Sequence, residues 1–232
     1  KNTDLVQNYV DLFLDTTSPE NIFIKDFVYI ETDESSRHSW DAFASPRSSS
    51  SSYYAGICPT ADALEQFGEF KTKTQNGDYI LYSSRQAFLE TLTPRQRAIA
   101  LFPGEVFRDK VVDVQAGLFP TYTGNEDPIR ASDVNQTTVI NGKTYNILGF
   151  DGIGTSAAPS SPTGLHMRKY NNYKASITDA NLWRSTQAWI DMRYAEVLLN
   201  LAEAAVELGG TSKIEDAMQA INQIRLRGGD NA

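Results

Sequence analysis

The chain has 232 residues, of which 41% are hydrophobic, and this is enough apolar material for one large domain. Lysine and arginine total 21 against 29 aspartate and glutamate, and the resulting net charge of −8 argues against a nucleic-acid partner and against an anionic membrane surface. One cysteine and two histidines argue against an internal disulfide and a zinc site, so we expect no cofactor and no metal.

The first part of the chain predicts short elements, identified by apolar spacing, β-branched content and turn residues. They are, in order, a helix over 4–15, a strand over 21–32, a loop over 33–56 and helices over 59–67 and 84–92. The last of these helices is expected to stop at Pro94, because proline breaks a helix that precedes it.

The middle of the chain, from 108 to 164, is rich in Gly, Pro, Asn, Asp, Ser and Thr and predicts mostly irregular structure. Within it, Asn141 and Gly142 separate two short runs of strand-forming residues. This spacing predicts a two-residue β-hairpin over 138–145.

The region over 186–229 predicts a pair of antiparallel helices. The first runs from Asp191 to Leu208, and its polar residues fall at spacings of three and four along one narrow stripe. A helix with only one narrow polar stripe exposes only that stripe to solvent. We therefore expect other parts of the protein to pack against the remaining sides of this helix. Gly209 and Gly210 follow as the turn, which resembles a tetratricopeptide-type hairpin.

The second helix of the pair begins with Ser212 and Glu215 in capping-box spacing and ends at Arg227, before Gly228. Its predicted apolar face consists of Ile214, Met218, Ile221 and Ile224.

Three stretches carry a resemblance to a known family. They are Asp191-Met-Arg-Tyr-Ala-Glu-Val-Leu-Leu-Asn-Leu-Ala-Glu-Ala with the Leu-Gly that follows, Gly164-Leu-His-Met-Arg-Lys-Tyr170, and Cys58-Pro-Thr-Ala-Asp-Ala-Leu-Glu-Gln-Phe67. Together they resemble the SusD/RagB family, most specifically over 160–229. The resemblance implies an α+β fold that is mainly α, in one partial domain over 1–232. Its loop-rich region covers 1–185 and its tetratricopeptide-like helix pair covers 186–229.

The resemblance also implies a function. Family members are lipid-anchored proteins on the outer face of the outer membrane of Bacteroidetes-type bacteria. They bind an oligosaccharide or other nutrient without catalysis and deliver it to a SusC-like TonB-dependent porin. We expect the chain to be a piece of such a protein that lacks the lipid anchor, the early helical repeats and the C-terminal tail.

The loop over 33–56 holds the residues that best suit sugar binding, which needs aromatic faces and planar polar side chains. These candidates are Trp40, Tyr53, Tyr54, Arg37 and Asp41. An alternative interpretation is that Trp40 or Tyr54 pins the loop to the core.

A second group of candidates lies closer to the helix pair. Trp183, near Asp179, is the more open binding candidate there, whereas we expect Tyr170 and Trp189 to pack in the core.

Two other functions remain as alternatives. A repeat-type protein-interaction scaffold without sugar binding would expose an apolar patch on the helices, and a glycosidase would need a close pair of carboxylates in a cleft. The segment Thr123-Gly-Asn-Glu-Asp127 is a candidate for calcium binding, although it does not have the twelve-position loop pattern.

Overall fold

A computed structural model describes residues 9–52, 55–72, 74–77, 80, 82–115, 117–118, 129–130, 136–152 and 161–228. In this part of the chain helix exceeds strand, and every sheet is a two-stranded antiparallel ribbon. The expected α+β class with mainly helical content is confirmed.

The helical elements follow one another in short pieces before two long helices. They are η1 (Glu34–Ser36), α2 (Trp40–Ala44), η2 (Arg47–Ser49), α3 (Ala61–Glu65), α4 (Arg85–Leu89), α5 (Pro94–Ile99), α7 (Tyr194–Leu208) and α8 (Thr211–Arg227). Residues 9–11 are also helical, at the end of the predicted N-terminal helix.

The strands are short and pair within five ribbons. They are β1 (Asn21–Lys25), β2 (Ala100–Leu101), β3 (Val106–Phe107), β4 (Lys110–Val111), β5 (Gly117–Leu118), β6 (Ile129–Arg130), β7 (Thr137–Ile140), β8 (Lys143–Asn146), β9 (His166–Met167) and β10 (Trp189–Arg193). The β1–β10 and β2–β9 ribbons join segments far apart in the sequence. They therefore bring the first part of the chain next to the segments just before the helix pair.

Two helices differ from the sequence prediction. The loop over 33–56 contains α2, which begins at Trp40, where the backbone N–H donates to Nδ1 of His38 at 3.2 Å. Helix α4 ends at Leu89, before the predicted stop, and Pro94 begins α5, because Thr93 and Gln96 form a capping box and proline suits the first turn.

The first long helix begins three residues later than predicted. Asp191 lies in β10, which pairs with β1, and the helix starts at Tyr194. The Tyr194 backbone N–H donates to the carbonyl oxygen of Glu20 at 2.8 Å, so the ribbon holds the residues just before the helix in extended form. The predicted strand over 21–32 is correspondingly short, ending at Lys25.

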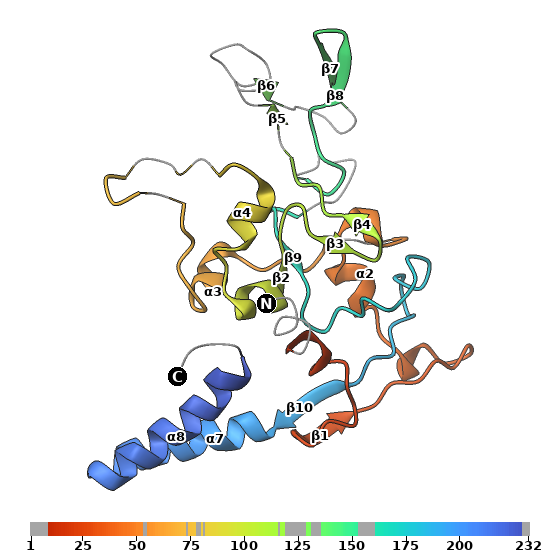
Figure 1. Cartoon of the computed structure of the whole chain (residues 1–232). Coiled ribbons are helices and arrows are strands. Elements are labelled where there is room, and N and C mark those ends of the chain that lie inside the picture. Colours follow the sequence, from red (N-terminus) through yellow and green to blue (C-terminus); the bar gives the residue numbers. More distant parts are fainter. Residues whose placement is uncertain are drawn as a thin grey trace.

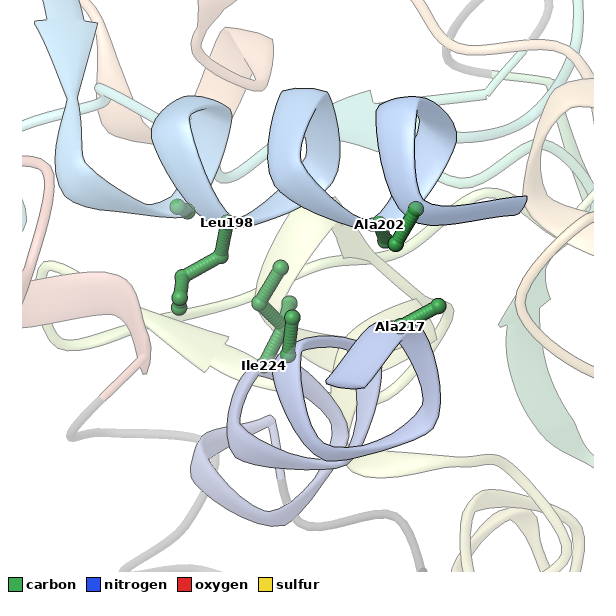
Figure 2. Packing of buried hydrophobic residues seen from close by; sticks show 7 residues of the cluster. Leu198, Ala202, Ala217 and Ile224 are labelled. Carbon is green, nitrogen blue, oxygen red and sulfur yellow. The ribbon is translucent and has the colours of Figure 1, made fainter. Parts of the chain in front are cut away.

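The predicted helix pair is confirmed, and α7 and α8 pack against each other through one face of each helix (Figure 1). Leu198 and Ala202 of α7 face Ile224 and Ala217 of α8, as Figure 2 shows. Small alanine side chains let the two helices approach closely, and the larger Leu198 and Ile224 meet at the end of the contact that lies away from the turn.

The packing on several sides that we expected for α7 is not present in the described part of the chain. The apolar residues that face away from α8 are exposed, among them Val197, Leu199, Leu201, Val206 and Leu208. The reason is that α8 covers only the face built by Ala195, Leu198, Ala202 and Ala205.

The predicted cap of α8 is wrong, and its predicted apolar face is confirmed in part, at Ile221 and Ile224. Gly210 is the N-cap and no side-chain capping bond forms there. Ala217 and Ala220 share the buried face with Ile224, whereas Ile214 and Met218 are exposed. The contact follows the small residues because they permit the closest approach of the two backbones.

The predicted hairpin forms between β7 and β8. Asn141 and Gly142 make the turn, and both have positive φ angles, of 52° and 77°. This is the backbone conformation that a type I′ turn requires and that Asn-Gly favours.

Tyr170 is buried in a hydrophobic cluster, as expected of a core residue. Its ring packs with Phe13 and Ile190, and its hydroxyl donates to the carbonyl oxygen of Ile190 at 3.1 Å. Burial raises the pKa of the Tyr170 hydroxyl above its ordinary value.

Among the described helices, none is long and apolar enough to span a bilayer.

The helix contact gives a first prediction. Ile224→Ala should lower the free energy of unfolding by about 2–5 kcal/mol, because it removes a buried side chain and leaves a cavity. Ile214→Ala is the matched control on the same helix, since Ile214 is 51% exposed and Ile224 only 8%. Urea unfolding followed by circular dichroism measures both, and equal effects would contradict the packing of α7 on α8.

Candidate functional site

A cavity of about 660 Å³ lies against α2 and the segment that leads into β10. All three tryptophans of the chain line it, although Trp40 is far from Trp183 and Trp189 in the sequence. The other aromatic lining residues are Phe27, Phe43 and Tyr170, with the ring of His38. Ile57, Leu182 and Ala188 complete the apolar wall, and Ser39 and Gln187 add polar groups.

Two loops are joined to form this cavity. The backbone N–H of His38 donates to the carbonyl oxygen of Ser185 at 3.0 Å, and that of Ser185 donates back to His38 at 2.9 Å. Next to this bridge, the Trp183 backbone N–H donates to Ser39 Oγ at 2.9 Å. These bonds place Trp40 and Trp183 on the same cavity.

Trp40 both lines the cavity and packs on the core. It is half-buried, its edge meets the Tyr170 ring, and its indole N–H donates to the carbonyl oxygen of Lys169 at 3.3 Å. Trp40 therefore fits both interpretations of the sequence: it pins its segment to the core, and it lines a cavity.

Trp183 and Trp189 are the accessible aromatic side chains of the cavity, at 43% and 46% exposure. Trp183 has a positive φ of 53°, so its backbone adopts a conformation that bulky residues rarely take. The Trp189 ring stacks on Tyr170, with centroids 4.9 Å apart and planes inclined by 20°. One face of Trp189 is thus covered by the core.

The expectation that Trp189 is a core residue is wrong. In β10 successive side chains point to opposite faces, so Ile190 is buried and Trp189 is exposed. The sequence of this strand does not show which face is buried, because Trp189, Ile190 and Met192 are all apolar and only Asp191 is polar.

The polar side chains of the cavity are already engaged by the protein. His38 accepts the Trp40 backbone N–H at Nδ1, and its Nε2 lies 2.9 Å from the carbonyl oxygen of Gln187. Both contacts are satisfied at once by the neutral ring protonated on Nε2. The Gln187 amide donates to the carbonyl oxygen of Tyr170 at 2.8 Å.

Asp41 does not line the cavity. It is only 2% exposed and lies on the buried side of α2, where it ties the helix to other segments. Its Oδ1 lies 3.2 Å from Nη2 of Arg108 and accepts the Asn172 backbone N–H at 2.7 Å. Its own backbone N–H donates to Ser185 Oγ at 2.9 Å. Burial raises the pKa of the Asp41 carboxyl, and the Arg108 guanidinium opposes that rise.

Arg37 also lies outside the cavity lining. It is buried, with its guanidinium 4.4 Å from the centroid of the Tyr29 ring and Nη2 donating to the carbonyl oxygen of Glu31 at 3.2 Å. Tyr53 and Tyr54, and the acidic run from Thr123 to Asp127, lie outside the described residues.

The described lining of the cavity consists of aromatic, aliphatic and hydrogen-bonding side chains. Among these described residues none carries a carboxyl group, so the pair of carboxylates that a glycosidase uses is not found there. Across the described ranges, no three His, Cys, Asp or Glu side chains gather as they would around a metal ion.

The model of the SusD family matches residues 19–232, and the chain belongs to this family. Among curated proteins, none matches the sequence at a significant level.

Solved structures show the same fold. One is a SusD-like protein from Bacteroides fragilis, with 19% identity and a TM-score of 0.55 over 97% of this chain and 39% of that one. Another is a SusD-like carbohydrate-binding protein from Bacteroides fragilis, with 20% identity and a TM-score of 0.50 over 93% of this chain and 35% of that one. The chain thus spans well under half the length of these relatives.

The buried ion pair gives a second prediction. Asp41→Asn should lower the free energy of unfolding by about 3–5 kcal/mol, because it leaves the Arg108 charge buried without its counter-charge. Asp26→Asn, at an exposed position, is the control and should change little. Thermal or urea unfolding measures the difference. Equal stability of the two variants would show that Asp41 does not hold α2 in place.

Proposed function

We propose that the chain binds an oligosaccharide at the tryptophan-lined cavity, without breaking a bond. The observation that carries the proposal is the gathering of Trp40, Trp183 and Trp189 around one cavity of about 660 Å³. The family membership of residues 19–232 supports it, as does the carbohydrate-binding relative from Bacteroides fragilis.

The physical basis is stacking of sugar rings on aromatic faces. A pyranose presents a face of C–H groups that packs on an indole ring, and Trp183 and Trp189 have the exposed faces for this. We expect roughly micromolar-to-millimolar dissociation constants, because the costs of association offset most of the gain. Weak binding suits a protein that passes its ligand on.

We further propose the setting in which the binding acts. The full-length protein is held by a lipid anchor on the external face of the outer membrane and delivers the saccharide to a SusC-like TonB-dependent transporter. Of the predicted ligand contacts, Trp40 and Trp183 keep that role and Trp189 joins them. Asp41 and Arg37 are proposed to position the segment that carries Trp40.

Removal of the exposed indole gives a third prediction. Trp183→Gly should weaken saccharide binding by about tenfold or more, the scale of one lost aromatic anchor. Glycine suits the positive φ at this position, so the melting temperature should stay nearly unchanged. The test is a glycan array on the wild-type chain, followed by calorimetric titration of a positive saccharide against the variant.

Phe23→Ala is the matched control for this experiment. Phe23 is an exposed aromatic residue on β1 and does not line the cavity. Unchanged affinity in Trp183→Gly, or an equal loss in Phe23→Ala, would contradict binding at this cavity.

A second candidate function is a protein-interaction scaffold, and the exposed apolar residues of the helix pair favour it. Val197, Leu201 and Val206 of α7 lie on the side away from α8, together with Tyr194 and Leu208. Exposed apolar patches of this kind mark surfaces that pack against other protein. The two functions use different parts of the molecule.

The separation of the two surfaces gives a fourth prediction. Leu201→Glu should leave saccharide affinity unchanged and abolish co-purification with the TonB-dependent transporter, because a charge on an apolar contact is costly when buried. Trp183→Gly should weaken saccharide binding and leave co-purification with the transporter unchanged. Loss of saccharide binding in Leu201→Glu, with the fold retained by circular dichroism, would show that the helix pair and the cavity are one site.

A further inference from the structure

We infer that the inner part of the tryptophan-lined cavity holds an aryl group attached to the saccharide, while the sugar ring itself stays at the cavity mouth on Trp183 and Trp189. This inference rests on the proposed function and specifies its ligand as an aryl-substituted saccharide. It follows from the hydrogen-bonding capacity of the wall, from its graded exposure and from its aromatic content.

The first argument is the shortage of polar side-chain groups for sugar hydroxyls. Both ring nitrogens of His38 and the amide nitrogen of Gln187 are engaged by protein backbone. The Gln187 Oε1 is covered by protein atoms, and Ser39 Oγ already accepts the Trp183 N–H. Among the described lining side chains inside the cavity, the Ser39 hydroxyl proton and the second amide hydrogen of Gln187 are what remain for a ligand.

The hydroxyl groups of a pyranose ring find few partners among the described side chains of this wall. Each hydroxyl moved from water to an apolar wall without a partner costs free energy, and a pyranose carries several. An aryl ring carries no such groups, and its transfer out of water is favourable in proportion to the apolar area that is buried. The inner wall therefore selects a substituent without hydroxyl groups.

The second argument is the gradient of exposure across the cavity. Trp183 and Trp189 are exposed, whereas Phe27, Phe43 and Ile57 are half-buried. The two exposed tryptophans offer broad faces together with indole N–H donors, which suits a sugar ring that remains partly in water. The half-buried phenylalanines offer only carbon, which suits the group attached to that ring.

The third argument is the aromatic character of the inner wall. Phe27 already meets the His38 ring edge-to-face, with centroids 4.6 Å apart, so the wall presents both ring faces and ring edges. An added ring gains offset or edge-to-face contacts with such a wall beyond the burial of its area. A cavity of about 660 Å³ has room for a phenyl ring together with part of the sugar that bears it.

The experiment compares matched glycosides on the full 232-residue chain. Methyl and phenyl β-glycosides of glucose, galactose and xylose, together with free phenol, are titrated by calorimetry. We expect the phenyl glycoside of the preferred sugar to bind at least about tenfold more tightly than its methyl counterpart, given the area of one buried ring. It should also bind more tightly than phenol.

Phe27→Ala tests the location of the ring. This variant removes part of the inner wall and should bring the affinity ratio of phenyl to methyl glycoside down several-fold toward one. Phe23→Ala makes the same chemical change at an exposed site outside the cavity and should leave the ratio intact. If Phe27→Ala fails to fold, Ile57→Ser replaces it.

The outcomes separate this inference from the proposed function. Equal binding of methyl and phenyl glycosides would overturn the inference and leave saccharide binding standing. Phenol binding as tightly as the phenyl glycosides would support an aryl-binding cavity and overturn the role of the sugar. A phenyl preference that survives in Phe27→Ala would overturn the placement of the ring in this cavity.

Discussion

The cavity depends on the burial of Asp41, whose contacts join segments that are distant in the sequence. Its carboxylate meets Arg108 and the Asn172 N–H, and its backbone N–H meets Ser185. A buried carboxylate must find such partners, and the partners here come from three parts of the chain. By satisfying them, the protein fixes α2 against the segment that carries Trp183 and Trp189, and the three tryptophans come together as a consequence.

What could be predicted from the sequence was mostly local. The Asn-Gly hairpin and the two long helices are specified by residues close to one another, and all of them form. The length of β10 and the exposure of Trp189 were not predictable in this way, because the partner strand β1 lies near the other end of the chain. Likewise, the composition of the loop over 33–56 indicated aromatic residues of interest, but only the folded chain shows that Trp40 shares a cavity with Trp183.

The predicted polar contacts Arg37 and Asp41 show a second reason why binding residues are hard to predict from sequence. Arg37 and Asp41 are planar polar side chains on an aromatic-rich segment, which is the composition that a sugar site needs. In the folded chain they serve the packing of that segment, with Arg37 against Tyr29 and Asp41 against Arg108. Residue types indicate which chemistry is available, whereas burial decides whether a ligand or the protein itself uses it.

The most direct test of the account is the intrinsic fluorescence of the chain during titration with a saccharide that a glycan array identifies. Because all three tryptophans line the cavity, the whole tryptophan emission reports on that one place. The account predicts a saturable shift of the emission, with a midpoint that equals the calorimetric dissociation constant. Saccharide binding by calorimetry with no change in emission would contradict it, since the ligand would then bind away from every tryptophan.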